Sequence, residues 1–149
     1  MSLGLKALKI AQTQIGQKEN PLGSNWGVPV KNYLASVGLN FPAAWCMAFV
    51  YWCFDQVSKP NNPLIKSGGV LHCWNKADKK YRVVGEPQKG DIFIMDYGKG
   101  LGHTGIVLDI KDNLIHTIEG NTNDTGSREG IMVCVKIRPK SKIKGYLRY

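Results

Sequence analysis

Residues 43 to 54 form an almost unbroken apolar run, Ala-Ala-Trp-Cys-Met-Ala-Phe-Val-Tyr-Trp-Cys-Phe, which limits the fold more than any other feature. A helix that is apolar on every side has to be buried, so we expect this run to form the central helix of the core. The run is shorter than the ~20 apolar residues of a membrane-spanning helix, and we expect no integral membrane segment. Pro42 suits the first turn of a helix, which predicts a helix that begins there and carries Cys46 near its N-terminus.

The rest of the chain has a suitable size to pack around one such helix. The protein has 149 residues, and its 43% hydrophobic content is enough to fill a single core. The sequence contains no internal repeat and no linker between composition-distinct segments. We therefore predict one domain over residues 1–149, and we expect a monomer.

Helical patterns come first along the chain, and strand patterns follow. Apolar spacing and turn residues predict helices over 3–15 and 29–37, besides the central helix, and a shorter one over 69–79. The period then changes to that of strands, which are predicted at 91–96, 103–110, 114–119, 131–137 and 145–149. Helices followed by strands predict an α+β fold, with N-terminal helices packed on a C-terminal antiparallel sheet.

A tight polar turn, Lys111-Asp112-Asn113, separates two of these strands and allows their pairing to be worked out. Counted back from this turn, the partner of His103 falls between Glu119 and Asn121, with facing Cβ atoms about 5 Å apart. Glu119 and Asn121 should share one face because strand side chains alternate. The hairpin therefore predicts hydrogen bonding between His103 and one of these side chains.

A thiol, an imidazole and a carboxylate in this chain order are the parts of a nucleophilic cysteine site. Cys46 near a helix N-terminus would have its thiolate favoured by free N–H groups and by the helix dipole, and its own N–H could help stabilise an oxyanion. The alternative is an ordinary core cysteine, as expected for an isolated Cys in an apolar run. The presence of His103 and Glu119 favours the nucleophile.

The other three cysteines, Cys53, Cys73 and Cys134, are interpreted as buried and unreactive thiols. Cys46 and Cys53 would lie two helical turns apart, roughly 10 Å, which is too far for a disulfide. The spacing of the cysteines and histidines matches no usual zinc motif. We predict no metal site and no cofactor.

Several segments together resemble the CHAP amidohydrolase/peptidase family, and the phage-type branch most closely. The resemblance extends over nearly the whole chain and rests on these segments: 15–19 (Ile-Gly-Gln-Lys-Glu), 45–49 (Trp-Cys-Met-Ala-Phe), 90–92 (Gly-Asp-Ile), 102–107 (Gly-His-Thr-Gly-Ile-Val) and 119–121 (Glu-Gly-Asn). It implies a papain-like peptidoglycan hydrolase fold. By this resemblance Cys46 is the nucleophile, His103 the general base and then acid, Glu119 the group that orients the imidazole, and Asn121 a supporting polar residue.

Two departures from the family pattern concern the region before the nucleophile. Many relatives carry acidic residues just before the Trp-Cys pair, whereas residues 40–44 are uncharged here. Some CHAP domains bind calcium through clustered Asp residues upstream of the nucleophile, but this chain has no Asp before Asp55. A calcium site of that kind is therefore not expected.

Trp26 and Trp45 are the candidates for contacts with substrate, because aromatic rings offer large flat surfaces to a glycan. Simple packing is the alternative for Trp26, which lies in a Gly-containing loop. Glu19 could border the cleft, although a solvated loop end is the interpretation we favour. His116 alternates with its apolar neighbours in the strand and is expected to face away from Glu119.

The charge balance points to an anionic partner, since 20 Lys and Arg stand against 11 Asp and Glu, a formal net charge of +9. Nucleic acid is disfavoured because the basic segment 136–144 carries no groove-reading or base-stacking signature. The anionic bacterial cell wall fits the catalytic interpretation better, with action in the periplasm or outside the cell. No apolar signal peptide is visible at the start of the sequence.

Together these features predict a cysteine-dependent peptidoglycan hydrolase that cuts an amide bond of the wall. Cleavage within the stem peptide is favoured over cleavage between sugar and stem peptide, because the chain shows no saccharide-binding repeat. One alternative is a secreted antibacterial effector or toxin with the same chemistry. Another is a wall-binding module whose site is catalytically silent.

Overall fold

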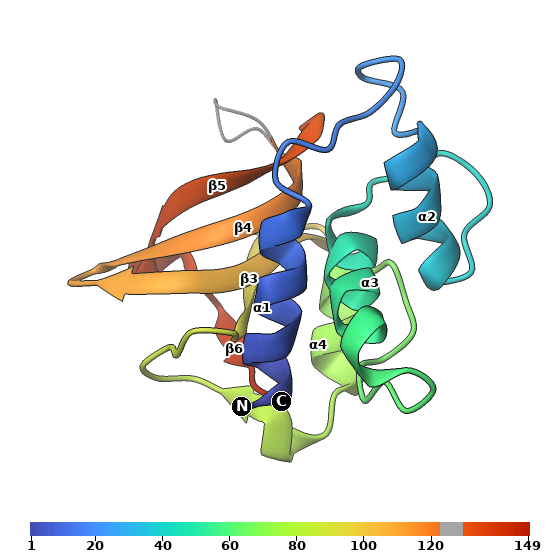
Figure 1. Ribbon diagram of the computed structural model, residues 1–149. Helices are drawn as coiled ribbons and strands as arrows, with labels where there is room; N and C mark the ends of the chain where they lie inside the picture. The colour runs from blue at the N-terminus through green and yellow to red at the C-terminus, as the bar shows by residue number, and fades with distance from the viewer. Residues whose placement is uncertain (123–129) are drawn as a thin grey trace.

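The computed structural model of the protein describes residues 1–122 and 130–149. Its helices are α1 (Leu3–Thr13), α2 (Val28–Ser36), α3 (Cys46–Ser58) and α4 (Val70–Lys76). Helices α1 and α3 lie side by side against the sheet, and α2 packs on the far side of α3 (Figure 1). The predicted arrangement of N-terminal helices on a C-terminal sheet is confirmed.

Helix α3 begins at Cys46, so the prediction that it starts at Pro42 was wrong. Trp45 is the N-cap residue, with a φ of −125° that lies outside the helical region. Its indole ring stacks on Tyr33, and its Nε1 donates a hydrogen bond to Glu19. These tertiary contacts hold Trp45 outside the helix and leave Cys46 as the first helical residue.

Within the described residues, the sheet contains six strands in the order β1-β6-β2-β3-β4-β5, and all these pairings are antiparallel. The strands are β1 (Arg82–Val83), β2 (Ile92–Gly98), β3 (Leu101–Lys111), β4 (Leu114–Thr122), β5 (Met132–Pro139) and β6 (Gly145–Leu147). All five predicted strands are present, and β1 was not expected because it has only two residues. The predicted turn is confirmed, since Lys111 pairs with Leu114 across the β3–β4 hairpin.

The core is built around α3, which is buried along most of its length. The helix can approach β4 closely because Gly120 has no side chain. A Cβ at Gly120 would lie 2.8 Å from both Phe49 Cβ and Trp45 Cζ3, which is closer than carbon atoms normally pack. This close approach brings the N-terminus of α3 next to the strand that carries Glu119.

No helix within the described residues is long and apolar enough to span a membrane. The longest, α3, runs from Cys46 to Ser58 and is buried by the surrounding elements instead.

Candidate active site

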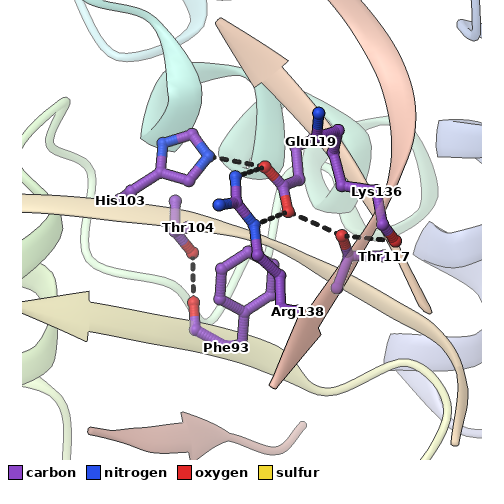
Figure 2. Close-up of polar contacts among 7 residues, drawn as sticks. All are labelled: Phe93, His103, Thr104, Thr117, Glu119, Lys136 and Arg138. Atoms are coloured by element: carbon purple, nitrogen blue, oxygen red, sulfur yellow. Dashed lines mark hydrogen bonds and ion pairs between the residues drawn. The ribbon is translucent and has the colours of Figure 1, made fainter. Parts of the chain in front are cut away.

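The site assembles side chains from β3 and β4. His103 lies near the start of β3 opposite Met95, and Glu119 lies toward the end of β4. His103 Nε2 and Glu119 Oε1 are 2.7 Å apart, and both side chains are essentially buried, with 1% and 0% exposed (Figure 2). The hydrogen bond expected from the hairpin register is therefore present.

The two side chains meet because Gly105, between them, has no side chain. A Cβ at Gly105 would lie 2.7 Å from both Glu119 Cγ and Ile118 O. The Glu119 side chain can therefore extend across β3 at position 105, because glycine alone leaves room for it there. In the preceding residue, Thr104 Oγ1 donates a 2.7 Å hydrogen bond to Phe93 O and so connects β3 to β2 (Figure 2).

Glu119 accepts hydrogen bonds from three residues. Besides His103, Arg138 donates through Nε to Oε2 at 2.9 Å and through Nη2 to Oε1 at 2.6 Å. Thr117 Oγ1 lies 2.6 Å from Oε2 (Figure 2). Burial raises the pKa of the carboxyl, but the bonds from Arg138 and His103 outweigh it and lower the pKa to about 2. Glu119 is therefore ionised at any pH at which the protein would work.

His103 lies between this carboxylate and the thiol of Cys46. Burial lowers the pKa of the imidazole, but interactions with Cys46 and Glu119 outweigh it and raise the pKa to about 9. Nε2 is committed to Glu119, while Nδ1 is buried and makes no hydrogen bond to any described nitrogen or oxygen. Nδ1 is thus the ring nitrogen left to exchange a proton with the thiol.

Cys46 is the first residue of α3, so the helix does not use its backbone N–H. The thiol is largely buried, with 5% of the residue exposed. Cys53 and Cys73 lie in the core, where burial raises the pKa of Cys53 well above its usual value and that of Cys73 to about 11. All four cysteines are free thiols. Cys46 is therefore the one that combines an imidazole partner with a helix N-terminus.

Trp45 does not line a surface groove, because none of its surface is exposed. Its Nε1 donates a 2.8 Å hydrogen bond to Glu19 Oε2, and Gly23 N donates to Glu19 Oε1. Glu19 itself is only 1% exposed, so the interpretation of it as a solvated loop end was also wrong. The indole N–H and the carboxylate satisfy each other in the core, and this pair anchors the 19–23 loop to the residue before the nucleophile.

Trp26 is half-buried and packs against the hydrophobic core around α3, so part of the residue remains at the surface. Asn121 is buried and has a left-handed φ of 56°, at a point where the β4–β5 register shifts. The regular alternation used to place Asn121 beside Glu119 is therefore interrupted at this position.

Sequence reasoning missed Arg138 and Thr117. Arg138 belongs to the basic segment that we interpreted as a source of general positive charge. The β4–β5 register pairs Glu119 with Cys134 and Thr117 with Lys136. Arg138 shares a face with Cys134 because strand side chains alternate, so knowledge of this register would have placed Arg138 on the side of Glu119. That register cannot be counted from the sequence, because β4 ends at Thr122 and β5 begins only at Met132.

The described residues contain no group of three or more His, Cys, Asp or Glu side chains placed to hold a metal ion. The chemistry that the site offers is that of a thiol, an imidazole and a fixed carboxylate.

The family model of the CHAP domain matches residues 38–121, which include all four predicted catalytic residues. The chain belongs to the CHAP family. CHAP domains are hydrolases of the cysteine- and histidine-dependent amidohydrolase/peptidase type that act on peptidoglycan, which places the action of the family at the cell wall.

The fold of this CHAP domain is also similar to a solved structure, the crystal structure of Ly7917. The TM-score is 0.61 at 14% sequence identity, over 99% of this chain and 62% of that one. The CHAP domain described here thus spans less than two thirds of the Ly7917 chain. No curated protein gives a significant match. The similarity supports the papain-like α+β fold.

Proposed function

We propose that the protein is a cysteine-dependent peptidoglycan hydrolase in which Cys46 is the nucleophile. The observation that carries the proposal is the buried 2.7 Å bond between His103 and the ionised Glu119, next to a thiol at the start of α3. A core cysteine without a catalytic role would not require a buried charged pair, which is costly to desolvate. The intact set of groups also argues against a silent binding module.

In the proposed reaction, His103 Nδ1 takes the proton of the Cys46 thiol, and Sγ attacks the carbonyl carbon of a wall amide. The backbone N–H of Cys46 stabilises the oxyanion. The C–N bond breaks as the His103 imidazolium protonates the leaving amine, and a thioester remains on Cys46. His103 then takes a proton from water, and the hydroxide attacks the thioester carbon. The C–S bond breaks, the acid product leaves, and the His103 imidazolium returns its proton to Cys46 Sγ. Glu119 holds the imidazole in place and stabilises its charged form.

We further propose that the amide lies within the stem peptide. Support comes from the loss of one of the two tryptophans predicted to contact sugar, since Trp45 lies in the core and Trp26 alone of that pair reaches the surface. The basic charge would hold the protein on an anionic wall, so raised salt should weaken wall binding without changing the products.

Digestion of purified peptidoglycan followed by mass spectrometry tests both parts of the proposal, the hydrolase activity and the choice of the cleaved amide. Stem-peptide cleavage releases new peptide amines and leaves the lactyl-peptide linkages intact. Free glycan chains together with complete stem peptides would instead establish an N-acetylmuramoyl-L-alanine amidase and reject the choice of bond. No product from folded protein, at neutral pH and with reduced Cys46, would reject the hydrolase itself.

A further inference from the structure

Arg138 has no role in the proposed reaction, although it is bonded to the carboxylate that orients His103. It lies on β5, almost completely buried, and its guanidinium contacts both oxygens of Glu119 at 2.6 and 2.9 Å (Figure 2). An arginine and a carboxylate in this two-point geometry fix each other's plane as well as their charge.

The contacts of Arg138 complete a full set of bonds around the carboxylate. Oε1 accepts from His103 Nε2 and Arg138 Nη2, and Oε2 accepts from Arg138 Nε and Thr117 Oγ1. Two carboxylate oxygens offer about four acceptor sites, so none is left over. Glu119 can neither rotate nor take up a proton without losing one of these bonds.

We propose that Arg138 is a positioning residue that keeps Glu119 ionised and fixed, and thereby makes His103 present Nε2–H to Glu119 and Nδ1 to Cys46. A carboxylate held this way can only accept, so neutral His103 must carry its proton on Nε2. Nδ1, the remaining nitrogen, is then the basic one. The inference rests on the proposed function, because it assigns the second partner of the orienting carboxylate.

The charged and titratable groups near Glu119 come from each of the neighbouring elements. They are His103 on β3, Cys134 and Arg138 on β5, Cys46 on α3, and Tyr97 on β2, which acts on Arg138. Arg138 and His103 are the two that lower the pKa of Glu119. When His103 gives up its proton during turnover, Arg138 is the cation that remains beside the carboxylate.

Removal of the guanidinium charge should therefore raise the pKa of Glu119. A neighbouring opposite charge typically lowers a carboxyl pKa by about 1 to 3 units, and burial acts in the opposite direction. Arg138→Gln should move the titration of Glu119 upward by about that amount. Arg138→Lys keeps the charge but not the two-point geometry, so the titration should stay near that of the wild type while turnover falls.

The titration can be followed without substrate by NMR of protein labelled with ¹³C at the glutamate carboxyls, with the Glu119 signal assigned from Glu119→Gln. The matched control is Arg148→Gln. Arg148 makes a similar two-point contact with Asp91, at 2.9 and 2.8 Å, without touching Glu119. We expect the Glu119 titration to move in Arg138→Gln and to remain in place in Arg148→Gln.

Turnover supplies the second measurement. Arg138→Lys should lower kcat about 10- to 100-fold with little change in KM, the usual effect of a misplaced catalytic group. An unmoved Glu119 titration in folded Arg138→Gln, or unchanged kcat in Arg138→Lys, would overturn the inference. If Arg138→Gln does not fold, Arg138→Lys provides the test of the charge. A Glu119 pKa near 4.5 in that variant would also overturn the inference, because the positive charge would be present without lowering the pKa.

The test of Arg138 and the test of the proposed function can fail independently of each other. A wild-type protein that fails to cut peptidoglycan but shows the expected Glu119 titrations would reject the function and retain the role of Arg138 at the carboxylate. A protein that cuts peptidoglycan while its Glu119 titration is insensitive to Arg138→Gln would retain the function and reject the role.

Discussion

Glu119 reaches His103 across Gly105, and the space for this contact exists only because residue 105 has no side chain. A Cβ there would lie 2.7 Å from Glu119 Cγ and 2.8 Å from Phe93 Cε1. The glycine of the His-Thr-Gly segment is therefore part of the geometry of the site, although it carries no chemistry of its own.

Gly105→Ala should displace Glu119 from His103 and lower wall-lysis activity strongly. Overpacking of a buried position typically costs about 1 to 3 kcal/mol, so thermal unfolding should also occur at a lower temperature. Gly85→Ala is the matched control, since a Cβ at Gly85 would meet nothing within 4 Å. Wild-type lysis by Gly105→Ala would show that the orienting contact is dispensable.

Cys46→Ala should abolish wall lysis while the protein remains folded, because the proposed nucleophile is removed. Cys53→Ala should retain substantial activity, since Cys53 is a core thiol whose pKa is raised by burial. Turbidity of a wall suspension and circular dichroism measure the two properties. Equal loss of activity in both folded variants would contradict the assignment of Cys46.

We expect the pKa of His103 to set the alkaline limit of activity. Because it is raised from 6.5 to about 9 in the folded protein, the imidazolium contributes to stability below pH 6.5, and this contribution is lost as the pH rises through 9. The same proton is needed for the leaving amine. We therefore expect kcat to fall above about pH 9, and a profile that already falls near pH 6.5 would contradict the assigned partners of His103.

Glu119→Gln keeps the size of the side chain and removes its charge. The imidazolium loses a stabilising partner, so kcat should drop and its alkaline limit should move below pH 9, while KM changes little. Glu86→Gln is a suitable control because it removes an exposed carboxylate that is paired with Lys140. If Glu119→Gln leaves kcat unchanged, the orienting role passes to Asn121.

Chelation should leave activity nearly unchanged, whereas alkylation should abolish it. The proposed mechanism uses only a thiol, an imidazole and a carboxylate, and the described residues show no cluster suited to a metal. Lysis rates after treatment with EDTA and with iodoacetamide make the comparison. Strong restoration of an EDTA-treated sample by calcium would overturn this prediction.

The sequence by itself was sufficient to predict the local features of this protein. The apolar run around Cys46 predicted the buried central helix, and the change of period after Lys89 predicted the strands, because both patterns are repeated over neighbouring residues. The count from the turn at Asp112 placed the partner of His103 between Glu119 and Asn121, because a short hairpin sets the register of its strands. The hydrogen bond between His103 and Glu119 falls within that range, although the β3–β4 register shifts between Val107 and Asp109.

Only the tertiary structure decided which groups surround these elements. Trp45 meets Glu19 across 26 positions of sequence, and Arg138 meets Glu119 across 19, and no local pattern encodes contacts of that separation. Trp45 was taken for a substrate contact and Arg138 for general basic charge because each residue type is usually exposed at least in part. Their burial depends on strand registers and helix packing that form only when the whole core assembles, and the same packing makes Cys46 the first residue of its helix.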